Sequence, residues 1–310
     1  MAISAAAEYS AVKGLRSAVI AQLLASTLRV STPLLFAATG GLCSERAGVI
    51  NIALEGMMLI GAFGAAVGTL ATHSAWAGAA LGAAAGALFA LIYGFFVIRW
   101  RANQIVAGVA MNMLALGLTP FGCKILYDVT GSTPAIPITD RFQWAPLPLS
   151  WSAIILCWFL FTHTSVGLRL GFAGEHPQAL EAAGVRVNRV RWLAVLLSGA
   201  LAGMGGASLS IYLSSSFSRN MTAGRGFIAL AALIFGKWKP IPTAVACLLF
   251  GFSEAVQVRL QLQGVTLWGK EPLPVQFTQV LPYLVTILVL AGFVGRARPP
   301  KALGTPFRED

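Results

Sequence analysis

Few polar side chains interrupt the apolar sequence of this chain, and those that could do chemistry lie in four stretches. The first runs from Ser44 to Gly56 and holds two carboxylates, one arginine and one asparagine. Asn51 and Glu55 are four residues apart, so they share a face of any helix that contains both. Glycines at positions 40, 41, 48 and 56 predict a broken or re-entrant helix. In a membrane such backbone survives only when it is buried in protein or lines a cavity.

Two interpretations of this first stretch stay open. In one, Glu45 pairs with Arg46 at the membrane interface and Glu55 hydrogen-bonds a neighbouring helix. In the other, Asn51 and Glu55 belong to a solute pathway or its gate, because an intramembrane carboxylate is costly and usually faces protein or water.

The second stretch is Asn103 to Asn112. Asparagine is a favoured helix N-cap, which by itself explains Asn103. Asn112 lies inside the apolar segment that follows, where an amide either binds a solute or joins two helices by hydrogen bonds. We favour the second reading for Asn112 and keep both asparagines as pathway candidates.

The third stretch is a polar stripe in the segment 241–262. Glu254, Gln257 and Gln261 recur at intervals that place them on one helical face. The stripe is either the exposed outer end of a helix or the outer half of a polar pathway. Arg29, in the middle of the first apolar segment, is a candidate partner for Glu55 or Glu254.

The fourth stretch runs from Gly174 and Glu175 to Gly184 in a loop rich in arginine. Pro177 suits the first position of a helix and Gly184 suits the residue just after one, so the sequence predicts a short helix over Pro177–Ala183 that includes Glu181. A transporter would need such a bounded helix to dock on a soluble motor. A simple solvated connection is the alternative.

Several kinds of chemistry are excluded. The sequence has no G-x-x-x-x-G-K-[ST] phosphate loop, so it does not bind ATP in that way. No serine, cysteine, histidine or paired acids have catalytic spacing, so we expect no enzyme activity and no cofactor. The three histidines are too far apart for a metal site, and the four cysteines, without a C-x-x-C pair, are predicted to be free thiols.

Membrane-spanning helices must position these side chains. The 310 residues are 57% hydrophobic and 11% charged, with a mean hydropathy of +0.76, which is more apolar surface than a soluble core buries. The sequence therefore predicts an all-α integral membrane protein, a polytopic helical bundle of about nine spans. The apolar segments are 17–38, 47–72, 76–98, 104–127, 148–163, 193–213, 224–237, 241–262 and 277–295. The segments 148–163 and 224–237 are short enough for tilted or partial spans.

Positive charge orients these segments. Lysines and arginines cluster in four places, and nine alternating spans put all four on one side, which the positive-inside rule makes cytoplasmic. The clusters are Arg99 with Arg101, the loop that ends at Arg191, Lys237 with Lys239, and Arg296 to Lys301. This pattern explains the net charge of +11 without nucleic acid. It predicts an N-terminal segment 1–16 at the interface, a membrane domain 17–295 with a cytoplasmic loop 164–192, and a cytoplasmic tail 296–310.

Four motifs resemble the permease subunits of bacterial ABC uptake systems for nucleosides and simple sugars, in the branched-chain amino acid, ribose and nucleoside permease superfamily. They are Glu45–Met58, Asn103–Leu118, Gly174–Gly184 and Gly224–Ala231. The likeness spans roughly residues 17–295, and the first motif is more similar to the nucleoside branch than to the ribose branch.

The resemblance implies an ABC importer fold, with Glu175–Gly184 as the coupling helix that sits in a groove of the ATP-binding subunit. It also implies three partners: that ATP-binding ABC subunit, a second homologous permease, and a periplasmic or lipoprotein solute-binding protein. We therefore expect a multi-pass protein of the bacterial inner membrane that forms the translocation pathway for a nucleoside. A permease for a pentose or another simple sugar, a stand-alone proton-coupled secondary transporter that uses Glu55 or Glu254, and a membrane scaffold or sensor are the alternatives.

Overall fold

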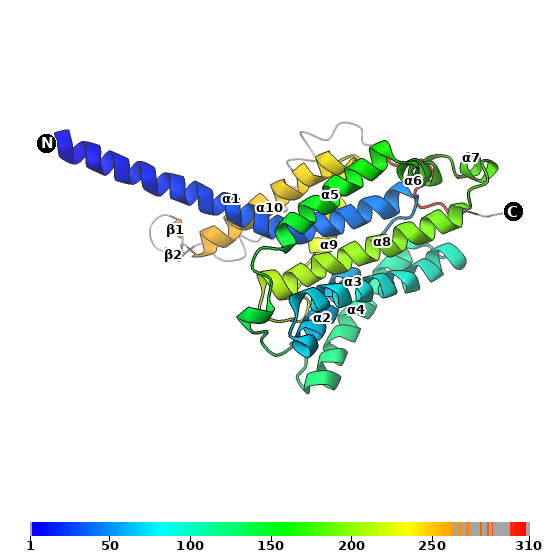
Figure 1. Ribbon diagram of the computed structural model, residues 1–310, viewed down its shortest axis with the longest axis horizontal. Coiled ribbons are helices and arrows are strands. Elements are labelled where there is room, and N and C mark those ends of the chain that lie inside the picture. Colours follow the sequence, from blue (N-terminus) through cyan, green and yellow to red (C-terminus); the bar gives the residue numbers. More distant parts are fainter. Residues whose placement is uncertain are drawn as a thin grey trace. The chain divides into compact units, whose positions relative to one another are not determined.

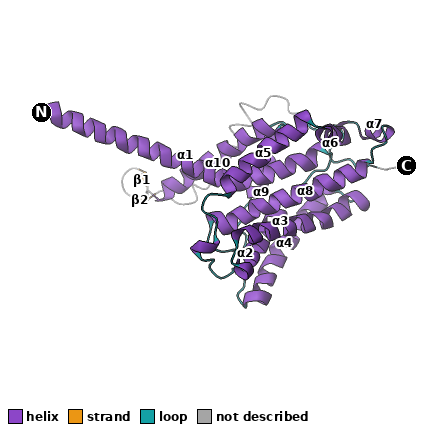
Figure 2. Cartoon of the chain, in the orientation of Figure 1, coloured by secondary structure: helices purple, strands orange, loops and turns teal. Residues whose placement is uncertain are grey.

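The computed structural model describes the backbone of residues 2–262, 266–267, 271–272, 280, 284, 287 and 298–307, and the side chains of 19–262, 280, 284, 287 and 298–307. Helices make up almost all of the regular secondary structure among the described residues (Figures 1 and 2). The helices are α1 (Ala2–Arg46), α2 (Leu54–Thr72), α3 (Ala75–Gly94), α4 (Gln104–Tyr127), α5 (Pro146–His163), α6 (Ser165–Glu175), α7 (Pro177–Ala182), α8 (Val187–Ser208), α9 (Arg225–Phe235) and α10 (Pro240–Leu262).

Short elements complete the described backbone. Five-residue π-helical turns, η1 (Phe95–Arg99) and η3 (Leu209–Leu213), continue α3 and α8, and a 3₁₀ turn, η2 (Ile138–Asp140), lies before α5. Two-residue strands β1 (Thr266–Leu267) and β2 (Glu271–Pro272) form an antiparallel pair.

Seven of the described helical stretches are long and apolar enough to cross a membrane, which confirms a polytopic membrane protein. Eight of the nine apolar segments expected from the sequence contain a described helix, and the seventh of them, 224–237, contains α9, which has only 11 residues. At 1.5 Å per residue α9 is about 16 Å long, roughly half of the hydrocarbon core. The expected segment 277–295 lies outside the described residues except for positions 280, 284 and 287, so the structure describes fewer spans than the nine expected.

The structure corrects the expected limits of the first two spans. α1 runs on to Arg46, so Ser44, Glu45 and Arg46 end a helix instead of beginning one. Gly40 and Gly41 do not break α1, because they serve packing. A Cβ atom at Gly40 would lie 2.6 Å from the Ser198 carbonyl oxygen in α8, and one at Gly41 would lie 2.6 Å from Leu233 in α9. The break follows Arg46, and α2 begins only at Leu54.

The described chain divides into two units, residues 1–31 with 248–293 and residues 32–247 with 294–310, and each is considered separately. In the second unit α2, α3 and α8 pack closely against one another (Figure 1). Gly78, Gly82 and Gly86 recur every four residues along one face of α3, and this glycine ridge faces these partners. Gly82 lies against Gly61 of α2, and Gly86 lies against Gly199 and Gly203 of α8. Small residues let the three backbones approach closely, which supplies dispersion energy inside a membrane.

α4 presents a broad apolar surface. Val106, Met113, Phe121 and Ile125 are each more than 60% exposed, which is typical of a face that meets lipid. The opposite face, which includes Asn112, packs against α2. All four cysteines are buried free thiols, as predicted.

Two loops that the charge pattern places on the same side of the membrane meet in the structure. The Phe142 N–H donates to the Ile211 carbonyl at 3.0 Å, and the Thr133 N–H donates to the Phe217 carbonyl at 3.1 Å. Phe217 is fully buried and packs edge-to-face on Phe63 of α2. The contact agrees with the alternation of spans between these loops.

In the first unit, the early part of α1 meets the later part of α10. Gly251 lies against the Ser31 side chain, and Arg259 donates to the Val19 carbonyl at 2.9 Å. Arg29 and Glu254 both belong to this unit, whereas Glu55 belongs to the other.

Candidate functional site

Residues 47–53, here called the α1–α2 junction, form an irregular segment in the interior. Ala47, Asn51 and Ala53 are fully buried, and Val49 is 1% exposed. Buried backbone N–H and C=O groups need partners. The last turn of α1 accepts from the first three N–H groups of the junction through the carbonyls of Ser44 and Glu45. Side chains from α3, α4 and α8 bind other backbone groups of the junction, which makes it the place where most of the conspicuous polar residues converge.

Ile50 binds two of these helices. Its N–H donates to the Gln104 side chain of α4 at 2.8 Å, and its carbonyl accepts a hydrogen bond from the Tyr93 hydroxyl of α3. The same hydroxyl lies 3.2 Å from the Gln104 carbonyl. Tyr93 is fully buried, so its single polar atom joins the junction to the start of α4.

Asn112 joins α4 to the junction and to α2. Its Nδ2 donates to the Ile52 carbonyl at 3.0 Å, and its Oδ1 accepts from the Gly56 N–H at 2.8 Å. Gly56 is one of the first four helical N–H donors of α2, which have no partner within the helix. The helix-joining interpretation of Asn112 is therefore confirmed.

Glu55 binds the N-terminus of α9. Its Oε1 accepts from the Gly224 N–H at 2.8 Å, and its Oε2 accepts from the Gly226 N–H at 2.6 Å. A helix N-terminus carries partial positive charge, so an ionised carboxylate suits this position. Gly226 is required for the approach, since a Cβ atom there would lie 2.5 Å from the Glu55 Cα. Glu55 thus hydrogen-bonds a neighbouring helix, as one of the two interpretations predicts.

Glu45 and Arg46 have partners other than each other. Glu45 is 3% exposed and accepts from the Trp238 indole N–H at 2.6 Å. The Arg46 guanidinium lies 4.6 Å from the centre of the Phe161 ring. The expected pair is replaced by these contacts because both residues lie in the last turn of α1, where they face α5 and the residues after α9 instead of each other.

Asn51 does not share a helical face with Glu55, because α2 begins only at Leu54. Its Nδ2 donates to Ser198 of α8 at 2.8 Å and lies 3.4 Å from the Met57 sulfur. Its Oδ1 is buried without a hydrogen-bond partner. Asn51 and Glu55 therefore point to different helices, α8 and α9.

The remaining pathway candidates lie elsewhere. Asn103 is exposed at the N-cap of α4, where its Oδ1 accepts from Ile105 and Val106, so the capping interpretation is confirmed. Glu254 and Gln257 are partly exposed on α10 in the first unit. The structure therefore gathers Asn51, Glu55 and Asn112 around the junction, whereas Asn103 caps α4 and the last two belong to the first unit.

The predicted short helix is present as α7, with Pro177 at its first position. Gly184 follows it with a φ of 79°, and its N–H donates to the Glu181 carbonyl at 2.8 Å. Pro177 and Leu180 are buried, whereas Gln178, Ala179 and Ala183 are exposed. α6 ends at Gly174 and Glu175, and hollows of about 300 and 340 Å³ adjoin the two helices.

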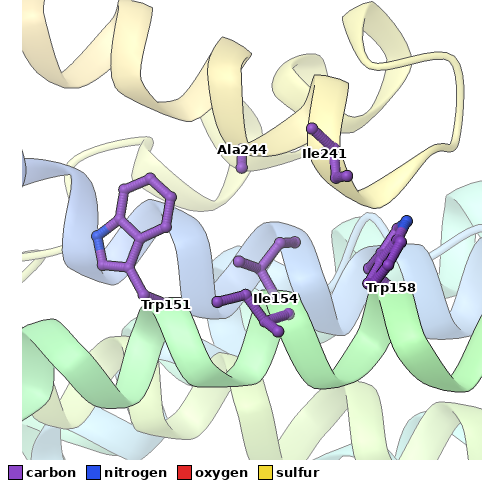
Figure 3. A pocket seen from close by; sticks show the side chains of 6 residues that line it. Trp151, Ile154, Trp158, Ile241 and Ala244 are labelled. Atoms are coloured by element: carbon purple, nitrogen blue, oxygen red, sulfur yellow. The ribbon is translucent and has the colours of Figure 1, made fainter.

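A separate pocket of about 170 Å³ lies between α5 and α10. Figure 3 shows Trp151, Ile154 and Trp158 of α5 facing Ile241 and Ala244 of α10. Its walls are apolar and aromatic, and recognition of a polar solute needs several converging polar groups. This pocket is therefore a poor candidate for a polar solute.

Arg191 is a functional candidate that the sequence reasoning missed, because it was counted with the cytoplasmic arginines. It is 2% exposed on α8 and donates to the carbonyls of Ala47, Ala173 and Thr305. Helical spacing could have revealed it, since Arg191 is four residues after Val187 and seven before Ser198, both on the buried face.

Comparison with known proteins agrees with this arrangement. The family described as "Branched-chain amino acid transport system / permease component" matches residues 23–290. The guanosine ABC transporter permease protein NupQ of Bacillus subtilis is 37% identical, over 93% of this chain and 97% of its own. The nucleoside ABC transporter permease protein NupC of Lactococcus lactis is 39% identical, over 92% and 96%.

Other permeases are also similar to this chain. The putative glucose ABC transporter permease protein TsgC13 of Haloferax volcanii is 36% identical over 87% of this chain and 91% of its own. The same Bacillus and Lactococcus each have a further similar permease, NupP at 28% and NupB at 22% identity. No solved structure matches the chain. A family match over most of the chain, with relatives above 30% identity along nearly their full length, shows that this multi-pass membrane protein belongs to the permease-component family of the branched-chain amino acid transport systems.

Proposed function

We propose that this chain is one permease subunit of an ATP-driven importer in the bacterial inner membrane and that its solute is a nucleoside. The observation that carries the proposal is the likeness of 37–39% to permeases described as transporting guanosine or nucleosides, over more than 90% of both chains. A glucose permease relative at 36% identity supports a simple sugar as the second candidate.

The partners follow from the same comparison. NupQ and NupP share one description in one organism, and NupC and NupB do so in another, which supports a pair of homologous permeases. ATP hydrolysis then belongs to a separate ATP-binding subunit, since this chain has no phosphate loop. A solute-binding protein on the outer side would deliver the nucleoside.

We propose that α7 docks on the ATP-binding subunit. The helix has six residues and is bounded by Pro177 and Gly184. Three of its exposed residues are alanines, Ala179, Ala182 and Ala183, and such small side chains suit insertion into a groove. Gly174 and Glu175, at the end of α6, would transmit the movement of α7 to the membrane helices.

The candidate pathway residues fall into two groups. Asn51, Glu55, Asn103 and Asn112 bind backbone groups or neighbouring side chains, which supports a role in holding the helices that surround a pathway. Glu254 and Gln257 are partly exposed on one face of α10, which supports contact with solute. The 11 residues of α9 support a partial, re-entrant span, and its N-terminus donates hydrogen bonds to Glu55 of α2.

The contacts of Glu55 argue against a proton-coupled secondary transporter. Both carboxylate oxygens accept backbone N–H groups, so the observed arrangement uses the ionised form. A protonated carboxyl group is a weaker acceptor than a carboxylate, so protonation would weaken the bonds from Gly224 and Gly226. This site therefore does not suit a carboxyl group that must bind and release a proton in each transport cycle.

Uptake by the purified transporter tests the proposal. The chain is reconstituted in proteoliposomes with its homologous permease, ATP-binding subunit and solute-binding protein, and accumulation of labelled guanosine, ribose and glucose is measured. We expect ATP-dependent accumulation of guanosine that neither sugar inhibits. Accumulation of a sugar instead would favour the second candidate. Accumulation by this chain alone under a proton gradient, without ATP, would show that it is not an ABC permease.

A further inference from the structure

Residues 300–307, here called the C-terminal strap, lie against α6 and the α1–α2 junction. The Ala302 N–H donates to the Gly174 carbonyl at 2.7 Å, and the Gly304 N–H donates to the Gly48 carbonyl at 3.1 Å. The Gly174 carbonyl is in the last turn of α6, where carbonyls have no partner within the helix. The strap thus binds both the end of α6 and the junction through its own backbone.

Arg191 strengthens this connection from α8. Its Nε lies 3.2 Å from the Ala47 carbonyl, Nη1 lies 2.9 Å from the Thr305 carbonyl, and Nη2 lies 3.4 Å from the Ala173 carbonyl. A planar guanidinium has five N–H donors in a rigid arrangement. One side chain therefore fixes the positions of the junction, the strap and α6 relative to one another. The salt bridges of the described residues do not include Arg191, so backbone oxygens take the place of a carboxylate.

The strap also supports α7. Phe307 is 8% exposed and forms an apolar cluster with Ala173 of α6, Leu180 of α7 and Val187 of α8. Arg191 lies 5.9 Å from the centre of the Phe307 ring. A six-residue helix has little stability of its own, so its orientation depends on what its buried face contacts. The buried face of α7 consists of Pro177 and Leu180, and Leu180 shares its apolar cluster with Phe307.

We propose that the C-terminal strap and Arg191 are a positioning device that makes α7 and the α1–α2 junction move as one body. The inference rests on the proposed function of α7 as the helix that docks on the ATP-binding subunit. A displacement of α7 passes to Gly174 through α6. From there the strap and the Arg191 guanidinium carry it to Gly48 and Ala47, which connect α1 to α2. Without the strap, α6 would keep its direct packing on the junction and the Arg191 bridge between Ala173 and Ala47, but the two hydrogen bonds that hold Gly174 and Gly48 to one segment would be lost, and with them the Phe307 ring in the α7 cluster.

Two variants with matched controls test the device in the complete reconstituted transporter. Ala302→Pro removes the N–H that donates to Gly174, and Lys301→Ala is its control, because the Lys301 side chain is exposed. Phe307→Ala removes the ring beneath α7, and Pro306→Ala, at an exposed position, is its control. The readout is nucleoside imported per ATP hydrolysed, together with the stimulation of ATP hydrolysis by the loaded solute-binding protein.

We expect Ala302→Pro to lower import per ATP by roughly fivefold, the equilibrium factor for about 1 kcal/mol from one lost hydrogen bond. Phe307→Ala should lower it at least as much, because it removes a buried ring from the cluster that includes Leu180. The controls should stay at the wild-type ratio. A strap that served stability alone would lower both activities in proportion to the amount of assembled complex and leave the ratio unchanged, and this result would overturn the proposal.

Failure of the proposed function gives a different result. If the wild-type complex hydrolyses ATP but imports no nucleoside, the proposed solute is wrong. The strap is then judged by stimulation of ATP hydrolysis alone. Loss of that stimulation in Ala302→Pro and Phe307→Ala, with the controls unaffected, supports the device, and full stimulation in both variants overturns it.

Discussion

Replacement of Glu55 by glutamine isolates the bond between α2 and the N-terminus of α9. Glutamine keeps one oxygen acceptor but places an NH₂ group where Oε2 now accepts from Gly226 at 2.6 Å. One charge-assisted hydrogen bond, worth about 1.5–3 kcal/mol, is lost, and the Gly226 N–H is left unsatisfied. The favourable charge at a helix N-terminus, up to about 2 kcal/mol in a partly buried site, is lost as well. We expect a destabilisation of roughly 2–4 kcal/mol.

Thermal unfolding of the purified, detergent-solubilised chain measures this loss. At roughly 2–4 °C per kcal/mol, a figure for soluble domains of 150–250 residues, Glu55→Gln should lower the melting temperature by about 5–15 °C. Asp128→Asn is the control, because Asp128 is exposed and pairs only with Lys124 one helical turn away. Equal melting temperatures for Glu55→Gln and Asp128→Asn would refute the assignment of Glu55 as the cap of α9. Wild-type stability together with loss of proton-driven uptake would support proton coupling instead.

The remaining predictions concern single contacts. Gly226→Ala places a Cβ atom 2.5 Å from the Glu55 Cα and should destabilise the chain by about 1–3 kcal/mol. Gly117→Ala is the control, because a Cβ atom there would have no neighbour within 4 Å, and thermal melting compares the two variants. Asn103→Ala removes the N-cap of α4 and should cost about 1 kcal/mol, while Asn103→Asp keeps the acceptor and should melt as the wild type does. The hydrogen bond from His73 lowers the pKa of Asp140, so its contribution to stability is complete above the usual pKa of aspartate and is lost as the pH falls through the lowered value. His73→Ala should reduce the fall of melting temperature at acid pH, and an unchanged fall would contradict the pairing.

Local patterns in the sequence were enough for much of the architecture. The lengths of the apolar segments predict α4 and α10 closely, because hydropathy alone decides whether a segment is long enough to cross a membrane. Pro177 and Gly184 predict α7, and Asn103 predicts the start of α4, because each signal acts on backbone within a few residues. The glycine ridge of α3 predicts close packing for the same reason, although not its partners.

The partners of the buried polar groups depend on tertiary structure. Glu55 and Gly224 are 169 positions apart, and nothing within either stretch indicates the other. Gly40 and Gly41 were expected to break the first helix, yet they lie within α1 because they make room for α8 and α9. Arg191 looks like any other cytoplasmic arginine until Ala47, Ala173 and Thr305 are brought around it.

The sequence by itself therefore determined that the chain crosses the membrane many times and which short helix projects from the bundle, because hydrophobicity and helix ends are local properties. Only the tertiary structure decided what Glu55, Asn112 and Arg191 do. A buried polar group must find a partner wherever the fold brings one, and here those partners are backbone atoms at the ends of other helices. Backbone atoms carry no residue-specific signal in the sequence, so pattern alone could not predict that Glu55, Asn112 and Arg191 bind the ends of other helices.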